Sequence, residues 1–278
     1  MTYNTVSLTI ENHVAHVSLC RPKELNTMNA DFWEEIPAVF REIDLNTDVR
    51  VAVLSSTGKH FCAGLDLDMA AGQLEQNNIE KGRQGEAFRR MVLDLQHAFT
   101  TIEQCRKPVL AAIQGGCVGG GVDLICACDC RYATEAAYFT VKEIELAIVA
   151  DVGTLQRLPK IIPEGIAREL AFSGRKLSAS DAVSCGLVNQ VFKNHDDLLN
   201  GVMAIAADMA RHSPLALAGT KEMLNYARDH SVSDSLNYVA TWQAGMFSAA
   251  DVSEAFSASM EQKTARYSGL SDRASIHE

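Results

Sequence analysis

The sequence predicts an α/β core followed by a helical C-terminal region. Three observations lead to this fold class. Segments with strand and helix patterns alternate from the N-terminus to about residue 195, and strand patterns end at about residue 196. With 278 residues, 47% of them hydrophobic and 22% charged, the chain has the length and composition of one large globular unit. We therefore expect residues 1–195 to form the core and residues 196–278 to form the helical region.

The first segments predict a β-hairpin and a helix. An alternating apolar pattern, a polar turn and a second apolar stretch occupy residues 6–22 and predict the hairpin. Asn29 is a favourable cap for a helix whose apolar residues recur every three or four positions as far as Ile43. Pro37 lies inside this helix, so we expect it to bend or shorten the helix.

Two buried strands are predicted at residues 49–56 and 108–114. The first runs into the loop "GKHFCAGLDLDM" (58–69) and the second into "GGCVGGG" (115–121). Between them, the polar segment 75–85 predicts a surface-exposed stretch, followed by a helix. Because ligands of open α/β proteins bind where parallel strands end, we expect the two glycine loops to face one another at that edge.

The rest of the core continues with shorter elements. We expect a short helix from residue 122, a strand at 138–141, a helix at 167–173, and a helix that ends at Gly186 before a last strand. From residue 196 to about residue 267 helical periodicity dominates. This last region contains apolar residues that look exposed, so we expect it to mediate self-association; they include Trp242, Met246 and Phe247.

Charge and cysteine usage exclude several classes of protein. A formal charge of −10 argues against a nucleic-acid partner, and the chain has no apolar run long enough to cross a bilayer. The eight cysteines lack the paired spacing of a zinc site and predict reduced, mostly buried thiols. The first residues lack the pattern of a signal or transit peptide, and the last four, "SIHE", are no peroxisomal address. The expected location is the cytoplasm.

The glycine cluster at 115–121 allows two interpretations. It lacks the spacing of a dinucleotide-binding motif and of a P-loop, so neither kind of nucleotide site is expected. Its three consecutive glycines either form a tight turn or bring backbone N–H groups close to a ligand oxygen, as an oxyanion hole requires. The cluster by itself favours the turn.

Three acidic residues follow the glycines: Asp123, Glu143 and Asp151. Asp123 is a possible helix cap, and Glu143 a possible solvated side chain. Asp151 lies in an apolar, glycine-bearing stretch, where it either caps a helix over 152–158 or is a buried acid with a raised pKa that suits proton transfer. The histidines form neither a metal-binding motif nor a pair beside a promising serine.

Five segments resemble the successive motifs of the crotonase (enoyl-CoA hydratase/isomerase) superfamily: "RPKELNTMN", "GKHFCAGLDL", "AAIQGGCVGGGVDLICACDCRY", "VKEIELAIVADVGTLQRLP" and "ASDAVSCGLVNQV". The third and fourth are most similar to the Δ3,5-Δ2,4-dienoyl-CoA isomerase branch. The resemblance implies a crotonase-like β-β-α spiral core and a helical C-terminal trimerisation region, with trimers often paired into hexamers. It also implies an acyl-CoA thioester substrate and no metal or redox cofactor, since coenzyme A is part of the substrate.

The resemblance also implies roles for individual residues. The N–H groups of Leu65 and Gly120 match the oxyanion hole, and Asp123 and Glu143 match the two acid/base positions. Asp151 stands where hydratases usually carry glycine and where dienoyl-CoA isomerases carry aspartate, which favours a catalytic Asp151 over a helix cap.

Matched residues are also implied for binding the substrate and its coenzyme A. They are Arg21, Lys23, Ala63, Gly64, Leu65, Asp66, Leu67 and Gly120. The family's C-terminal cation maps equally well onto Lys263 or Arg266.

The predicted activity is therefore isomerisation of 3,5-dienoyl-CoA to 2,4-dienoyl-CoA in fatty-acid β-oxidation. Glu143 would take the C2 proton, Asp151 would deliver a proton at C6, and Asp123 would tune both. One alternative is an enoyl-CoA hydratase, because Asp123 and Glu143 keep a carboxyl pair. An alternative of another class is a catalytically idle oligomeric binding protein.

Overall fold

Two β-sheets organise the chain in the computed structural model, which describes residues 3–66, 69 and 80–272. The larger sheet has the strand order β1 (Val6–Glu11), β2 (Val14–Leu19), β3 (Val51–Ser56), β4 (Val109–Ile113), β6 (Cys130–Thr134), β9 (Gln190–Phe192). The smaller contains β5 (Gly116–Val118), β7 (Tyr138–Thr140) and β8 (Leu177–Ser178). β1 and β2 form the predicted antiparallel hairpin, and β3 and β4 are parallel neighbours. The α/β class is thereby confirmed.

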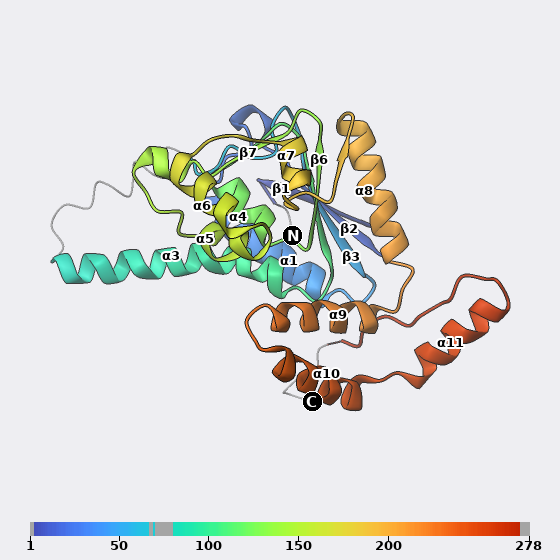
Figure 1. Cartoon of the computed structure of the whole chain (residues 1–278). Coiled ribbons are helices and arrows are strands. Elements are labelled where there is room, and N and C mark those ends of the chain that lie inside the picture. Colours follow the sequence, from blue (N-terminus) through green and yellow to red (C-terminus); the bar gives the residue numbers. More distant parts are fainter. Residues whose placement is uncertain (1–2, 67–68, 70–79, 273–278) are drawn as a thin grey trace.

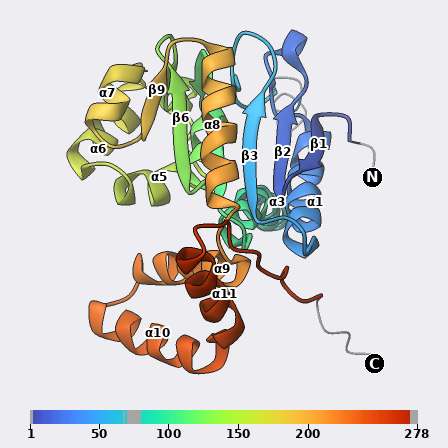
Figure 2. The same ribbon diagram turned by 90° about the vertical axis from the view of Figure 1, so that its right-hand side faces the viewer.

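Helices cover both faces of the larger sheet. On one face, α1 (Ala30–Leu45) and α3 (Lys81–Gln104) contribute to the main apolar core. On the other, α8 (His195–Met209) runs along the strands, as Figure 2 shows. Side chains alternate between these faces, so that within β3 Leu54 belongs to the main core and Val53 packs with α8. Because a strand buried on both faces has no solvent-facing positions, the first four residues of β3, "VAVL", are all apolar, and the two buried serines that end it form hydrogen bonds with His16 and Gln114.

The other helices form two groups (Figure 1). Beside the smaller sheet lie α4 (Gly120–Cys126), α5 (Thr154–Arg157), α6 (Glu164–Ser173) and α7 (Ala179–Ser184), with the short 3-10 helices η1 (Pro22–Glu24), η2 (Glu143–Leu146) and η3 (Leu158–Lys160). Below both sheets in the figure lie α9 (Pro214–Ala227), α10 (Val232–Met246) and α11 (Ala249–Met260). Within the described residues, none of these helices has the length and apolarity needed to span a membrane.

Several boundaries differ from those expected. The Asn29 side chain accepts a hydrogen bond from the Phe32 N–H, as a cap does, but Pro37 does not shorten α1, which runs for 16 residues. α3 begins at Lys81, so residues 81–85 of the polar segment form its first turns, while residues 75–79 lie outside the described part of the chain. The C-terminal helices end at Met260 instead of continuing to about residue 267. The start of α3 was predicted too late because polar residues occur in exposed helices as well as in loops.

The division at residue 195 remains a prediction. The structure adds that the helical region has two parts with different surroundings. α8 packs against β3, β4, β6 and β9 and completes the cover of the sheet. α9 and α10 instead pack against each other, and both lie with α11 apart from the strands (Figure 2).

Candidate active site

The two glycine loops meet, as their position after neighbouring strands predicts. Cys62 and Cys117 form a parallel bridge between the loops. The Val118 N–H donates to the Cys62 carbonyl over 3.0 Å, and the Cys62 N–H donates to the Gly116 carbonyl over 3.2 Å. Since β5 belongs to the smaller sheet, this contact lies at the boundary between the two sheets.

Local backbone geometry sets the direction of the Leu65 N–H. The Met28 N–H donates to the Gly64 carbonyl and the Asp66 N–H donates to the Met28 carbonyl, over 2.9 and 3.1 Å. Because successive N–H groups of an extended segment point in opposite directions, that of Leu65 points away from Met28. Gly64 makes this path possible, since its φ of +91° favours glycine and a Cβ there would lie 3.0 Å from the Val118 carbonyl oxygen.

The second predicted donor, the Gly120 N–H, begins α4. An N–H in the first turn of a helix has no acceptor within the helix, so it is available to a ligand. A Cβ built on Gly64 would lie 3.6 Å from Gly120 N, which places the two loops in van der Waals reach of each other there. This arrangement is compatible with an oxyanion hole formed by the Leu65 and Gly120 N–H groups, which stays a prediction.

Glu143 comes to the same place through the smaller sheet. β5 and β7 pair in parallel, and the Gly119 N–H donates to the Thr140 carbonyl beyond the end of β5. Glu143 begins η2 three residues later, and a Cβ on Gly119 would lie 3.0 Å from Glu143 Oε1. The carboxyl therefore lies beside the turn that precedes Gly120. Burial and the charge of Asp123 raise the pKa of Glu143 to about 7.

Asp123 is the most deeply buried of the three acids, with a side chain that is 0% exposed on α4. Its Oδ1 accepts a hydrogen bond from the Thr154 N–H over 2.5 Å. Burial raises the pKa of Asp123 to about 6, although hydrogen bonding from Thr154 lowers it. Asp123 thus caps α5 from a different helix.

Asp151 is not a helix cap. α5 begins at Thr154, its cap position is occupied by Gly153, and the first amide is taken by Asp123. Asp151 lies in the half-buried stretch just before this helix, and burial raises its pKa. The structure therefore removes the cap interpretation and leaves a partly exposed carboxyl near the other two acids.

The three carboxyls affect one another electrostatically. The charges of Asp123 and Asp151 both raise the pKa of Glu143, and the charge of Asp151 raises that of Asp123. Acids that interact in this way titrate as a group, because the ionisation of one makes ionisation of its neighbour less favourable. The site can therefore both accept and donate a proton.

The predicted coenzyme A contacts lie around the first loop. The Arg21 guanidinium donates to the Thr27 carbonyl over 2.7 Å and pairs with Asp66 at 3.5 Å. Lys23 is exposed on η1. The Ala63 N–H is used by the Leu25 carbonyl, over 3.1 Å.

The remaining predicted contacts are less defined. Leu67 lies outside the described residues. Lys263 pairs with Glu261 at 2.8 Å, and Arg266 is exposed, so the choice between these two cations stays open. In the described part of the chain, no group of three or more His, Cys, Asp or Glu side chains is arranged to hold a metal ion.

Sequence reasoning missed the residues that support the acids. The Thr154 N–H holds Asp123, and Gln96 Nε2 on α3 donates to the Asp151 carbonyl over 2.6 Å. Arg157 lies against Gly153, where a Cβ would be 2.0 Å from its Nη1. The "GTLQR" spacing, with arginine four residues after glycine, was the available signal, but its partners on α3 are more than 50 residues away in the sequence.

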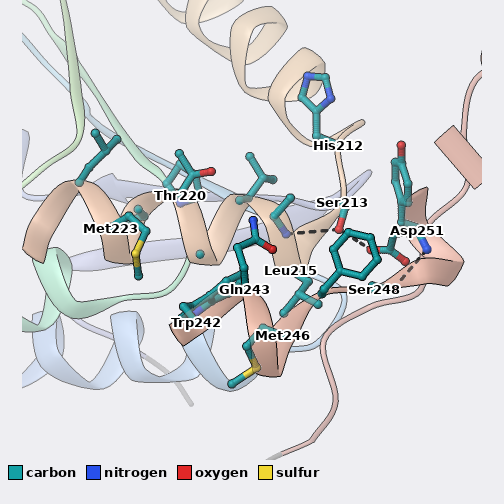
Figure 3. A pocket seen from close by; sticks show the side chains of 18 of the residues that line it. His212, Ser213, Leu215, Thr220, Met223, Trp242, Gln243, Met246, Ser248 and Asp251 are labelled. Atoms are coloured by element: carbon teal, nitrogen blue, oxygen red, sulfur yellow. Dashed lines mark hydrogen bonds between the residues drawn. The ribbon is translucent and has the colours of Figure 1, made fainter. Parts of the chain in front are cut away.

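A large cavity of about 940 Å³ lies elsewhere, between α9, α10 and α11 (Figure 3). Apolar side chains such as Leu215, Trp242 and Met246 line it, and at one end Ser213 Oγ donates to Asp251 Oδ2 over 2.5 Å. The predicted site residues that the structure describes are not among those lining this cavity. It is therefore separate from the three acids.

Comparison with known proteins gives one consistent family. The model of the enoyl-CoA hydratase/isomerase family matches residues 9–270. A peroxisomal Δ3,5-Δ2,4-dienoyl-CoA isomerase of Arabidopsis thaliana is 46% identical over 97% of this chain and 99% of its own length. A mitochondrial enzyme of the same name from Mus musculus is 45% identical over 94% of this chain and 81% of its own. Among solved structures, an enoyl-CoA hydratase from Bacillus anthracis superimposes with a TM-score of 0.87 at 31% identity, covering 96% of this chain and 100% of its own.

Proposed function

This chain belongs to the enoyl-CoA hydratase/isomerase family, and we propose that it isomerises 3,5-dienoyl-CoA to 2,4-dienoyl-CoA in fatty-acid β-oxidation. The observation that carries the proposal is the presence of a third carboxyl, that of Asp151, near the other two acids. Asp151 lies near Asp123 and Glu143 without serving as a helix cap, and its charge acts on both. Hydration across C2 and C3 needs two acid/base groups, whereas transfer of a proton between C2 and C6 needs groups at both ends of a longer segment.

The first step is removal of a proton from C2. Ionised Glu143 takes it, and the electron pair of the broken C–H bond moves into conjugation with the thioester carbonyl and both double bonds. Negative charge then develops on the thioester oxygen, where the Leu65 and Gly120 N–H groups stabilise it. Each such donor is worth about 3 kcal/mol in related sites.

The second step places a proton on C6. The extended dienolate carries part of its charge on C6, so protonated Asp151 donates there and the double bonds settle at C2 and C4. Glu143 ends protonated and Asp151 ionised, and proton exchange with solvent or between the coupled acids resets the site. Asp123 holds the turn that bears Asp151 and raises the pKa of Glu143 by its charge.

Binding of the coenzyme A portion is proposed at the first loop, through Arg21, Lys23, and the backbone from Ala63 to Leu67. Lys23 is exposed, whereas the Arg21 guanidinium is already engaged by Thr27 and Asp66. We therefore expect Lys23 to meet the phosphates directly and Arg21 chiefly to hold the loop. Proton transfer alone needs no added metal or nucleotide, so we expect activity to survive EDTA.

Two further proposals concern the whole protein. We propose a homotrimer, or a dimer of trimers, formed through the C-terminal helices, because exposed apolar side chains gather there, among them Leu236, Phe256 and Met260. The expected cytoplasmic location also stays a prediction. The similar protein of Arabidopsis thaliana is named as peroxisomal, and that of Mus musculus as mitochondrial.

The decisive variant is Asp151→Asn. An amide keeps the shape of the carboxyl but cannot deliver a proton, so we expect loss of isomerisation at unchanged KM, measured by the ultraviolet absorbance of the 2,4-dienoyl product. In D2O the variant should still exchange deuterium into C2 through Glu143. Glu145→Gln is the matched control, because Glu145 is a neighbouring acid that is exposed and paired with Lys142.

Other outcomes select the alternatives. Full isomerase activity in Asp151→Asn would remove the role of this residue. Hydration of a 2-enoyl-CoA by the wild type, without conversion of the 3,5-diene, would identify a hydratase. If neither substrate reacts although the thioester binds, the protein is a binding protein that keeps the family fold.

A further inference from the structure

The short turn from Asp151 to Thr154 connects two of the acids. Asp151 is its first residue, and the Thr154 N–H at its end donates to Asp123. A displacement of this turn would therefore move one carboxyl and break the hydrogen bond of the other. Gly153 within it has a φ of +135°, which glycine adopts freely and side-chain-bearing residues rarely adopt, so the path of this turn depends on a glycine at this position.

The Arg157 side chain fills the space against this turn. Its Nη1 lies 3.5 Å from the Val152 carbonyl oxygen, and a Cβ on Gly153 would be 2.0 Å from the same nitrogen. The Arg157 side chain is 13% exposed and thus largely screened from water. The guanidinium therefore contacts the turn at Val152 and Gly153, between Asp151 and Thr154.

The guanidinium is itself held by α3. Arg157 Nη2 donates to Thr100 Oγ1 over 3.2 Å and to Glu103 Oε2 over 3.0 Å. Burial alone would raise the pKa of Glu103, but hydrogen bonds and charges from Arg157 and Arg228 lower it, so this carboxylate stays ionised. Charge-assisted bonds to a partly buried arginine are stronger than those between neutral groups.

The same face of α3 contacts the other end of the turn. Gln96, Thr100 and Glu103 follow one another at helical spacing, and Gln96 Nε2 donates to the Asp151 carbonyl over 2.6 Å. A polar cavity of about 420 Å³ adjoins this face and the turn. On the side that faces this cavity, Gln96 and Arg157 contact the turn.

We propose that Arg157, anchored by Glu103, is a positioning residue that fixes the turn 151–154 and thereby the placement of Asp151 relative to Asp123. The proposal rests on the proposed isomerase function for its kinetic consequences. Its structural consequence, restraint of the Thr154 N–H, does not depend on the activity.

The test compares Arg157→Ala with Arg168→Ala. Arg168 forms an ion pair with Glu164, but its side chain is 63% exposed and the pair lies within one helix, α6. We expect Arg157→Ala to lower kcat about 10- to 100-fold, because small misplacements of catalytic groups have effects of this size. KM for the thioester should change less than about twofold, since ground-state binding is untouched. Arg168→Ala should match the wild type.

Hydrogen exchange supplies the readout that is independent of activity. In Arg157→Ala the peptide containing the Thr154 N–H should exchange faster, while peptides from β3 and β4 keep their protection. Glu103→Gln, which retains the shape of the anchor without its charge, should show both effects more weakly, and it serves if the alanine variant fails to fold.

The outcomes separate the two proposals. Wild-type kcat in Arg157→Ala, or unchanged exchange at Thr154, overturns the positioning role while the isomerase function stands. Equal losses in Arg168→Ala also overturn it, because the effect would not be specific to the turn. If the wild type does not convert 3,5-dienoyl-CoA, the function fails, and the exchange measurement alone then decides on Arg157.

Discussion

The raised pKa of Glu143 implies that this residue lowers the stability of the folded protein at neutral pH. Its pKa is about 7 in the folded protein, against an ordinary 4.5, so between these values the folded state binds more protons than the unfolded state. The contribution of Glu143 to stability is therefore greatest below pH 4.5 and is lost as the pH rises through about 7. The residue that suits proton transfer is one that destabilises the fold at neutral pH.

Glu143→Gln should accordingly stabilise the protein in a pH-dependent way. We expect a gain of about 1 to 3 kcal/mol in the free energy of unfolding above pH 7 and almost none near pH 4.5. Thermal melts at pH 5 and pH 8, with Glu145→Gln as the exposed control, measure the difference. The same shift in Tm at both pH values would contradict this assignment of the raised pKa.

At the scale of residues, the sequence predicted the acids but not their supports. Asp151 stands out because it is a carboxyl in an apolar stretch, whereas the roles of Asp123 and Glu143 come from the resemblance to the family and stay predictions. The Thr154 N–H that donates to Asp123 is a backbone group, which any residue except proline supplies, so this hydrogen bond leaves no signal in the sequence. Arg157 and Glu103 read as ordinary charged residues on separate helices, and only the tertiary fold makes them partners.

At the scale of elements, α1 joins the hairpin to the first glycine loop. Its cap Asn29 follows Met28 directly, and Met28 bonds to both Gly64 and Asp66. The segment that contacts the loop bearing the Leu65 N–H therefore also begins the helix. This explains why a local capping signal lies next to a predicted catalytic feature.

Asn29→Ala should lower the free energy of unfolding by about 1 kcal/mol, because the Phe32 N–H loses its acceptor. Asn29→Asp restores an acceptor and should return the stability close to that of the wild type. Urea unfolding followed by circular dichroism measures both. Equal losses in the two variants would show that the cap bond is not the cause.

Elements were predictable where one physical signal dominates. Alternation revealed the hairpin, and continuous apolarity revealed β3 and β4. α5 was misplaced because its first turn is capped by Asp123, 31 residues earlier, and not by a neighbour in the sequence. The strand predicted at 138–141 matches β7, whereas β5 lies inside the glycine cluster, whose composition resembles that of a loop.

At the scale of the molecule, the C-terminal helices present apolar side chains to solvent. Leu236 is 63% exposed, Phe256 is 67% exposed and Met260 is 83% exposed. The predicted Met246 and Phe247 are also exposed, whereas Trp242 is half-buried against Gly219 of α9. A surface of this kind is typical of an interface between subunits.

Light scattering should therefore give a mass of three or six times the 30.2 kDa of one chain. Replacing both Leu236 and Phe256 by glutamate should shift the mass toward the monomer, because charges would be buried at the interface. Leu45→Glu, an equivalent change at the exposed end of α1, should leave the mass unaltered. A monomeric wild type at micromolar concentration would contradict the proposal.

The position of α8 has a consequence for synthesis of the chain on the ribosome. Strands β1, β2, β3 and β4 pair in the order in which they are made, but the helix that packs along one face of this sheet is α8, which ends at Met209. Until α8 has been made, the apolar side chains on that face lack the helix against which they pack; they include Val51, Val53 and Leu110. At usual translation speeds the interval from β4 to α8 lasts roughly 5 to 20 seconds, and in it the nascent sheet is a target for chaperones and for aggregation.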